Sequence, residues 1–253
     1  MTRNPFLAAG VTGFALGGFF DGIVLHQLLQ WHHFLSLVPG DSWRDLRMQV
    51  LADGLFHVAT YALTALGLAL LWRARGGLAQ ASGRHVMGAA LLGFGVWQLV
   101  DVGVFHWVVG IHRIRVDVPD PLLWDIGWLV VVGLPPLLLG WWLRRGGDAP
   151  GPGRGRPAAA MLALAALVAA PVAALPPPGA TTSLVLFRPG IGLEGALAAV
   201  AAADARLAWA DASGGVAAVD FREGGSVAAL YRHGAIVVGR GMSFAACLAW
   251  TRA

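Results

Sequence analysis

The residues in this chain best suited to chemistry are aspartates and histidines that occur twice at one spacing. Both copies read Asp-x4-His-x5-His and lie 80 positions apart, and their members are Asp21, His26 and His32 in the first and Asp101, His106 and His112 in the second. Imidazole combined with carboxylate is a ligand set for Zn, Fe, Mn and Cu. A histidine that binds a metal usually donates its other N–H to a carboxylate. The repeated spacing therefore predicts a site for a metal ion, with Cu, Zn and Fe as the candidates.

Each copy is followed by one further acid at the start of an apolar run. Asp53 and Asp125 occupy these places, and His57 follows Asp53 by one helical turn, where the second copy has Leu129. Four histidines are expected to bind the metal or lie beside it, namely His26, His57, His106 and His112, with His32 as the next candidate. Four aspartates would be ligands or would orient the histidines, namely Asp21, Asp53, Asp101 and Asp125.

The position of these acids in apolar sequence needs a physical reason. A charged side chain at the centre of the hydrocarbon costs at least about 2.5–3.5 kcal/mol, so four unpaired acids would cost roughly 10 kcal/mol, as much as the net stability of a domain. The arginines expected on the same side each have an acid nearby in their own loop, and they are Arg44, Arg47, Arg113 and Arg115. Salt bridges are therefore a poorer explanation than metal binding. His33 has Arg113 at its matching position and is expected at the membrane interface.

Other functions fit the same residues. The Asp–His pairs could form a structural hydrogen-bond network in a non-catalytic accessory subunit, or could transfer protons. His26 and His106 on facing helices could be the axial ligands of a haem. A metal-bound water could also support a hydrolase or an oxidoreductase, with a lipid or a quinone reaching the site laterally.

Composition places these residues in a membrane protein. Of 253 residues, 57% are hydrophobic and only 13% are charged, about half the charged fraction of a soluble domain, and the mean hydropathy is +0.66. This composition argues against a soluble enzyme, and it excludes a disordered chain. The single cysteine excludes a disulfide scaffold and a Cys-cluster zinc site. The arginines are scattered over short loops, which argues against nucleic acid as a partner.

Five runs of about 20 apolar residues predict membrane-spanning helices at 6–31, 50–72, 86–109, 122–143 and 157–175. The fold class expected is an all-α transmembrane bundle of two repeated two-helix hairpins and a fifth helix. Asp21 and His32 would share one face if the first helix continued through both. Arginine is in excess in the loops 73–84 and 144–156, which favours a cytoplasmic N-terminus in a bacterial inner membrane and an extracytoplasmic C-terminus.

Composition changes after a triple proline at 176–178. Strands are expected at 183–187, 206–210, 215–221 and 235–238, with helices at 192–203 and 226–233. The order β-α-β-β-α-β is typical of a small ferredoxin-like domain. The expected organisation is a four-helix domain at 1–146, a fifth helix and linker at 157–178, and an extracytoplasmic domain at 181–253. That last domain could cap the site, and it carries three possible copper ligands, His233, Met242 and Cys247, although Cys247 fits a buried core position better.

Several stretches resemble one family of bacterial membrane proteins, domain of unknown function 2243. The similar stretches are Gly18–His33, Ala52–His57, Gly110–Arg113 and Trp124–Gly127, within residues 8–143. The resemblance implies a polytopic membrane protein. The family's association with genes for the assembly of copper-containing terminal oxidases implies a role in copper handling, with a respiratory oxidase or a metal chaperone as partner.

Overall fold

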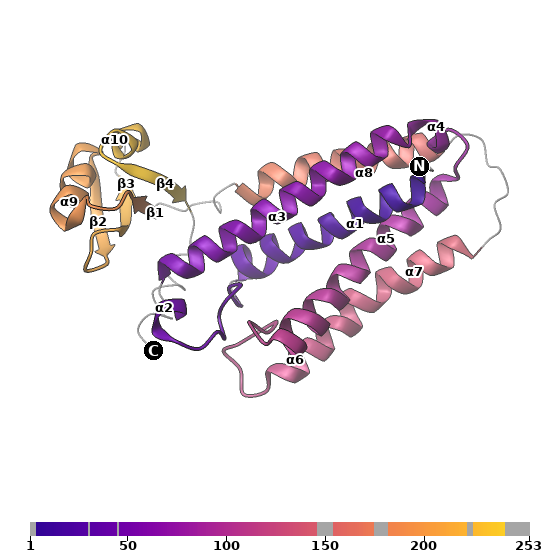
Figure 1. Cartoon of the computed structure of the whole chain (residues 1–253), viewed down its shortest axis with the longest axis horizontal. Coiled ribbons are helices and arrows are strands. Elements are labelled where there is room, and N and C mark those ends of the chain that lie inside the picture. The colour runs from indigo at the N-terminus through magenta and orange to yellow at the C-terminus, as the bar shows by residue number, and fades with distance from the viewer. Residues whose placement is uncertain are drawn as a thin grey trace. The chain divides into compact units, whose positions relative to one another are not determined.

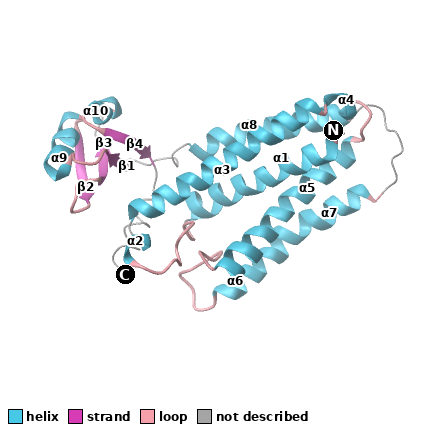
Figure 2. Cartoon of the chain, viewed as in Figure 1, coloured by secondary structure: helices cyan, strands magenta, loops and turns pink. Residues whose placement is uncertain are grey.

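The computed structural model describes residues 4–29, 31–44, 46–145, 154–174, 182–221 and 225–240. The chain divides into two compact units. The helical unit contains the described residues up to Arg44 and from Gln49 to Ala174, and the mixed unit contains the described residues among 45–48 and from Thr182 onward. Figure 1 shows the long helices of the first unit lying side by side, and Figure 2 shows that the strands are confined to the second.

The helical unit is built from α-helices that three π-helical segments (η) extend or interrupt. Its elements are α1 (Pro5–Asp21), η1 (Gly22–Leu29), α2 (Asp41–Arg44), α3 (Leu46–Arg73), α4 (Arg75–Leu78), α5 (Gly83–Val100), η2 (Asp101–Val109), α6 (Pro121–Trp128), η3 (Leu129–Gly133), α7 (Leu134–Arg144) and α8 (Gly155–Ala174). Five stretches are long and apolar enough to cross a membrane, at Pro5–His26, Leu51–Arg73, Gly83–Val109, Pro121–Arg144 and Gly155–Val172. The expected helical membrane protein with five candidate spans is thereby confirmed.

The first expected helix is too long. The observed helix ends at Leu29 with η1, so His32 lies beyond it. The assumption that one continuous helix places Asp21 and His32 on a common face is therefore wrong. The Trp31 N–H closes the end by donating to the Leu25 carbonyl at 3.0 Å.

Helices α1 and α5 pack backbone against backbone through glycine. A Cβ at Gly13 would lie 1.9 Å from the Ala90 carbonyl oxygen, and a Cβ at Gly93 would lie 1.9 Å from the Gly10 carbonyl oxygen. Only glycine permits this approach, as in other closely packed membrane helices. The contact brings the far ends of the two helices, and with them Asp21 and Asp101, toward one another.

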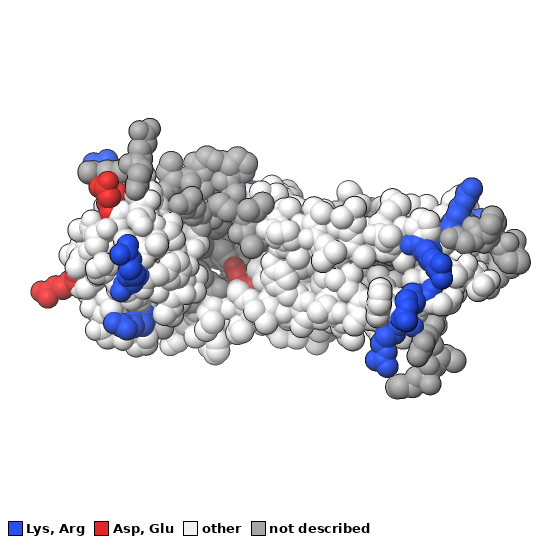
Figure 3. Space-filling view, turned by 90° about the horizontal axis from the view of Figure 1, so that it is seen from above, with Lys and Arg blue, Asp and Glu red and all other residues white. Residues whose placement is uncertain are grey.

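The outer faces of the bundle are apolar. Within the fourth candidate span, Pro121–Arg144, only 11% of the most hydropathic window is buried, and Leu123, Val131 and Leu138 are all exposed. Basic side chains gather at the end of the unit that carries α4, where α5 and α8 begin and α3 and α7 end (Figure 3). Apolar sides with charge confined to the ends are what a bilayer requires.

The mixed unit has the element order expected from the sequence. It contains β1 (Thr182–Phe187), α9 (Gly192–Ala202), β2 (Ala205–Ala210), β3 (Val216–Phe221), α10 (Val227–Arg232) and β4 (Ala235–Arg240). The strands form one antiparallel sheet in the order β2-β3-β1-β4. Alternate residues of β1 are buried, and they pack in a core with Val200, Val219 and Leu230. Met242 and Cys247 lie outside the described residues, and the Nδ1 of His233 is engaged with the Ala229 carbonyl at 2.8 Å.

Candidate metal centre

The π-helical segments explain why aspartate and histidine are five positions apart. Asp21 is the last residue of α1 and His26 lies in η1, while Asp101 and His106 both lie in η2. In a π-helix the backbone bonds join residues five apart, so these side chains fall on one face. An α-helix would separate them by about 140°. The spacing Asp-x4-His is therefore matched to the local backbone, and π-helical turns of this kind occur frequently at functional sites.

The second histidine of each copy comes from the loop that follows. His32 and His112 stack on one another, with ring centroids 4.7 Å apart and planes 12° from parallel. Each also lies 4.6 Å from the helical histidine of its own copy, His26 or His106. All four rings are at most 3% exposed, so four imidazoles form one buried cluster.

Each loop histidine is anchored by the backbone of the other loop. The Nδ1 of His32 lies 3.0 Å from the Ile114 carbonyl oxygen, and the Nδ1 of His112 lies 3.0 Å from the Phe34 carbonyl oxygen. A carbonyl only accepts, so both Nδ1 atoms donate and both Nε2 atoms keep a lone pair in the neutral ring. Burial lowers the pKa of His32 well below its usual value, and the nearby His26 and His112 lower it further. Burial also lowers the pKa of His112, although Asp101 opposes the shift.

Each helical histidine is oriented by an aspartate of the next helix. The Nδ1 of His26 lies 3.2 Å from Asp53 Oδ1, and the Nδ1 of His106 lies 2.9 Å from Asp125 Oδ1. A carboxylate accepts this N–H and directs the opposite nitrogen, Nε2, away from itself. Asp53 and Asp125 thus lie on the Nδ1 side of the helical histidines, and the orienting role that the sequence predicted for them as one of two possibilities stays a prediction.

The same two aspartates also hold the loops in place. Asp53 Oδ1 accepts the Phe34 N–H at 2.8 Å, and Asp125 Oδ1 accepts the Ile114 N–H at 3.0 Å. Phe34 and Ile114 are the residues whose carbonyls bind the loop histidines. Every anchoring bond of one copy therefore has its counterpart in the other.

Two loop residues that were not among the predicted site residues complete this arrangement. His33 is buried, not interfacial as expected, and its Nδ1 lies 2.6 Å from Asp53 Oδ2. Arg113 donates from Nη1 to Asp125 Oδ2 at 2.7 Å, so the expectation that loop arginines pair only with loop acids is wrong for it. Arg115 does pair with Asp117, at 2.7 Å. The sequence signal for these two contacts was that His33 and Arg113 occupy matching positions of the repeat, 80 residues apart.

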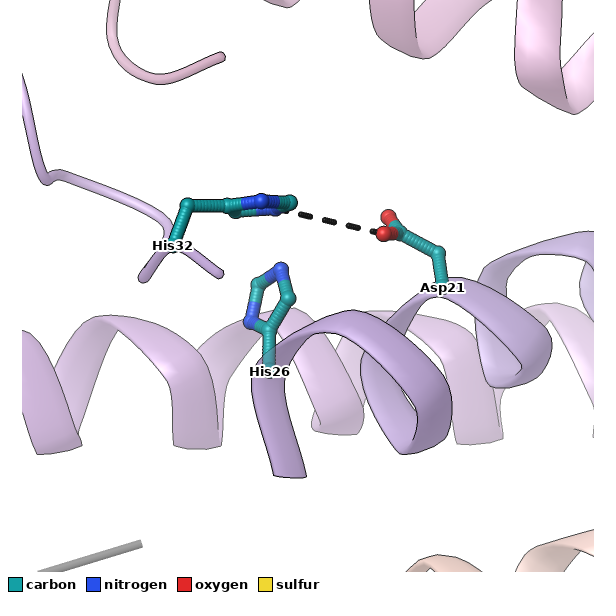
Figure 4. A group of neighbouring side chains, drawn as sticks. All are labelled: Asp21, His26 and His32. Carbon is teal, nitrogen blue, oxygen red and sulfur yellow. Dashed lines mark ion pairs between the residues drawn. The ribbon is translucent and has the colours of Figure 1, made fainter. Parts of the chain in front are cut away.

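The remaining polar atoms converge on two triads, Asp21 with His26 and His32, and Asp101 with His106 and His112. Within each triad, one potential ligand atom from each residue lies within 4.8 Å of the other two. In the first triad, Asp21 Oδ1 and His32 Nε2 are 4.0 Å apart, and Figure 4 shows the His32 ring directed at the carboxylate and the His26 ring standing up from its helix beside the His32 ring. Asp21 Oδ1, His26 Nε2 and His32 Nε2 are buried without a hydrogen-bond partner among the described residues.

The second triad is tighter. Asp101 places Oδ1 and Oδ2 at 3.2 Å from His112 Nε2 and His106 Nε2, respectively. The contact with His112 has hydrogen-bond geometry, but the neutral His112 Nε2 and the carboxylate oxygen are both acceptors, so a proton or a cation must lie between them. His106 Nε2 is without a hydrogen bond among the described residues. The two triads therefore share their residue types but differ in how closely the aspartate carboxylate approaches the histidine Nε2 atoms.

His57 is the predicted ligand that stands apart from the two triads. It is half-buried beside the first turn of η1, where a Cβ at Gly22 would lie 2.6 Å from its Cε1. Its role as a ligand stays a prediction. Gln98 is buried as well, and its Oε1 accepts the Trp128 indole N–H at 2.7 Å.

Two imidazoles and one carboxylate per triad form a ligand set found in Fe(II) and Zn(II) sites. The donor atoms are buried, their tautomers are fixed, and several have no partner within the described structure. These features define a polytopic helical membrane protein with a buried Asp/His centre.

Residues 8–147 match the model of a family described as predicted membrane protein, domain of unknown function 2243. The chain therefore belongs to this family, which confirms the resemblance seen in the sequence. The match contains both triads together with Asp53 and Asp125, and it ends before α8. No curated protein and no solved structure matches the chain.

Proposed function

We propose that this protein binds metal inside the membrane, with one ion held in each triad. The ligands would be the Nε2 atoms of His26, His32, His106 and His112 and the carboxylates of Asp21 and Asp101. Asp53 and Asp125 would orient the helical histidines without binding the ion. Loss of metal on mutation of the helical histidines is the central expectation.

The observation that carries this proposal is the common orientation of the four imidazoles. Every Nδ1 is engaged by a carbonyl or carboxylate, which turns every Nε2 toward Asp21 or Asp101. A purely structural network would also satisfy the inward atoms, yet three of them in the first triad have no partner among the described residues. Leaving a buried polar group unsatisfied costs about 1–3 kcal/mol. A bound cation would remove this cost.

The donor set supports Zn(II) or Fe(II) more strongly than Cu(I), which prefers cysteine and methionine. Copper handling, with delivery to a respiratory oxidase or exchange with a metal chaperone, rests on the association of the family's genes. It would depend on the mixed unit as well, where His233, Met242 and Cys247 are the possible soft ligands.

The proposed location is the extracytoplasmic half of a bacterial inner membrane. Arginines lie at one set of helix ends, at Arg73 of α3, Arg84 of α5 and Arg144 of α7, while the triads lie at the opposite ends of α1 and α5. If the arginine-rich loops stay in the cytoplasm, as the positive-inside rule expects, the triads would lie in the extracytoplasmic half of the membrane. The mixed unit would be extracytoplasmic.

Two finer points of architecture belong to the same proposal. The matched triads and their matched anchoring bonds support an origin of the first four spans in two repeated hairpins. The strand order of the mixed unit supports a ferredoxin-like domain. Residues 1–146, 157–178 and 181–253 would then be the three parts of the chain.

A metal-dependent enzyme is the second candidate, and one observation favours it. A cavity of about 420 Å³ lies between α3 and the Phe34 loop, and Phe56 and Phe105 in its wall are ring neighbours of the triad histidines. A lipid or a quinone could reach the centre by this route. Haem is less well supported, because His32 and His112 stack between the helical histidines and occupy the place of a macrocycle.

Elemental analysis of detergent-purified protein, run beside an optical spectrum, tests the proposal. We expect up to two ions per chain, and loss of most of them in the double variant His26→Ala, His106→Ala. His85→Ala, at the opposite end of α5 from the triads, is the matched control and should retain them. Metal content equal in the two variants, or near zero in the wild type after metal loading, would overturn the proposal. A Soret band would assign the histidines to haem instead.

A further inference from the structure

Two apolar cavities of the helical unit meet at one residue. The cavity beside the triads, of about 420 Å³, is lined mainly by α3, from Ala52 to Leu63. A second cavity, of about 530 Å³, lies between α1, α3 and α5 and reaches from Leu63 to Arg144 at the arginine-rich end. Each volume is in the range of ligand sites, and Leu63 lines both.

The two cavities together follow the helices over a considerable length. On α5 and η2, the lining residues run from Ala89 through Trp97 to Phe105. Sixteen helical residues span about 24 Å, most of the hydrocarbon thickness of a bilayer. A ligand filling this path would be long, narrow and aligned with the helices.

The end near the triads is separated from the metal ligands by single aromatic rings. Phe56 stacks on His26 with centroids 5.2 Å apart, and Phe34 lies 5.6 Å from His112. The Thr60 hydroxyl in this wall already donates to the Phe56 carbonyl. The Trp97 indole nitrogen has no hydrogen-bond partner among the described residues, but it is fully buried and so exposes no N–H to the cavity. Hydrocarbon therefore suits this end better than a quinone ring, whose carbonyls need accessible donors.

The opposite end is suited to a negative charge. The Arg144 guanidinium lies 4.9 Å from the Phe6 ring at the mouth of the larger cavity, and basic side chains surround this end of the unit (Figure 3). Arginine binds phosphate oxygens through a planar pair of donors. The cationic end and the apolar length of the cavities together match an amphiphile with an anionic head group.

We propose that the joined cavities hold one acyl chain of an anionic phospholipid. The phosphate lies at Arg144 and the end of the chain lies at Phe34 and Phe56. The second chain stays in the bilayer. The lipid chain is then the group presented to the triads. This assignment of a substrate class rests on the proposed metal function, whereas the binding of the lipid does not depend on it.

Photocrosslinking of the full-length protein tests this assignment. The probe is a phosphatidylglycerol with a diazirine near the end of one acyl chain, in phosphatidylcholine nanodiscs. We expect label on residues 52–63 and 97–105. Leu63→Trp should reduce it to the level on the outer face of α7, whereas Leu138→Trp on α7 should leave it unchanged. Ala59→Leu provides a milder block should Leu63→Trp fail to fold.

The charge at the mouth is tested separately. Arg144→Gln should reduce the preference for phosphatidylglycerol over a diazirine phosphatidylcholine about fivefold, as expected for one arginine near a lipid surface, and the neighbouring Arg145→Gln should change it little. Label spread evenly over α7, label insensitive to both blocking variants, or selective labelling by a free diazirine fatty acid alone would overturn the proposal. Metal content of the same samples shows independently whether the triads are occupied.

Discussion

At the scale of single residues, the site depends on atoms that never touch its centre. Asp53 and Asp125 fix the tautomers of His26 and His106 and also bind the loop amides. The triad residues could be found from the sequence because their spacing repeats. The roles of His33 and Arg113 could not be predicted, because a histidine and an arginine differ chemically. Their equivalence is seen only when each contacts the matching aspartate, Asp53 or Asp125.

Removing the orienting charge should weaken metal binding without removing a ligand. We expect Asp53→Asn or Asp125→Asn to lower metal affinity about 10–100-fold, the usual effect of losing a carboxylate behind a metal-binding histidine. Competition with a chelator during elemental analysis measures this. Asp117→Asn, in an exposed pair with Arg115, is the control. Affinities unchanged by both site variants would show that the carboxylates do not tune the centre.

Arg113 should contribute to stability mainly through Asp125. Its Nη1 donates at 2.7 Å to a carboxylate that is 0% exposed, and loss of a charge-assisted hydrogen bond costs about 1.5–3 kcal/mol. Arg113→Ala should lower the free energy of unfolding by this amount. Arg115→Ala should cost clearly less, because its pair with Asp117 is exposed. Equal losses in denaturation of the two variants in detergent would contradict this role.

At the scale of elements, hydropathy predicts the spans well because the bilayer fixes their length and composition. The expected run at 122–143 is observed as Pro121–Arg144, and the run at 86–109 as Gly83–Val109. Hydropathy carries no information on the hydrogen-bond register within a helix. It therefore does not predict the π-helical segments, although a pair five apart on one face already conflicts with the α-helical period. The end of the first helix at Leu29 escapes prediction for the same reason.

The glycine contact between α1 and α5 should hold the two triads at their observed separation. Gly93→Ala puts a Cβ 1.9 Å from the Gly10 carbonyl oxygen, and overpacking of this kind typically costs about 1–3 kcal/mol. We expect a lower thermal midpoint together with reduced metal content. Gly127→Ala in α6 has nothing within 4 Å of the new Cβ and should be neutral or stabilising. A neutral Gly93→Ala would show that the helices can separate without loss.

At the scale of the whole molecule, the residues that match the family include the whole candidate site, while the rest of the chain lies outside both. The match to residues 8–147 contains all eight aspartates and histidines of the two triads and their orienting carboxylates. Helix α8 and the mixed unit lie outside the matched residues. Strand and helix order in the mixed unit could be predicted because alternation and turn residues are local signals. The side of the membrane on which this unit lies depends on the direction in which the helices of the whole chain cross the bilayer.

That direction can be measured through accessible cysteines. In a Cys247→Ser background, Ser213→Cys in the mixed unit should react with a membrane-impermeant maleimide added to intact cells made permeable only at the outer membrane. Gln80→Cys in the arginine-rich loop should react only after the inner membrane is opened. Both side chains are exposed, so burial does not explain a difference. The reverse pattern would place the triads in the cytoplasmic half of the membrane, where an extracytoplasmic supply of metal could not reach them directly.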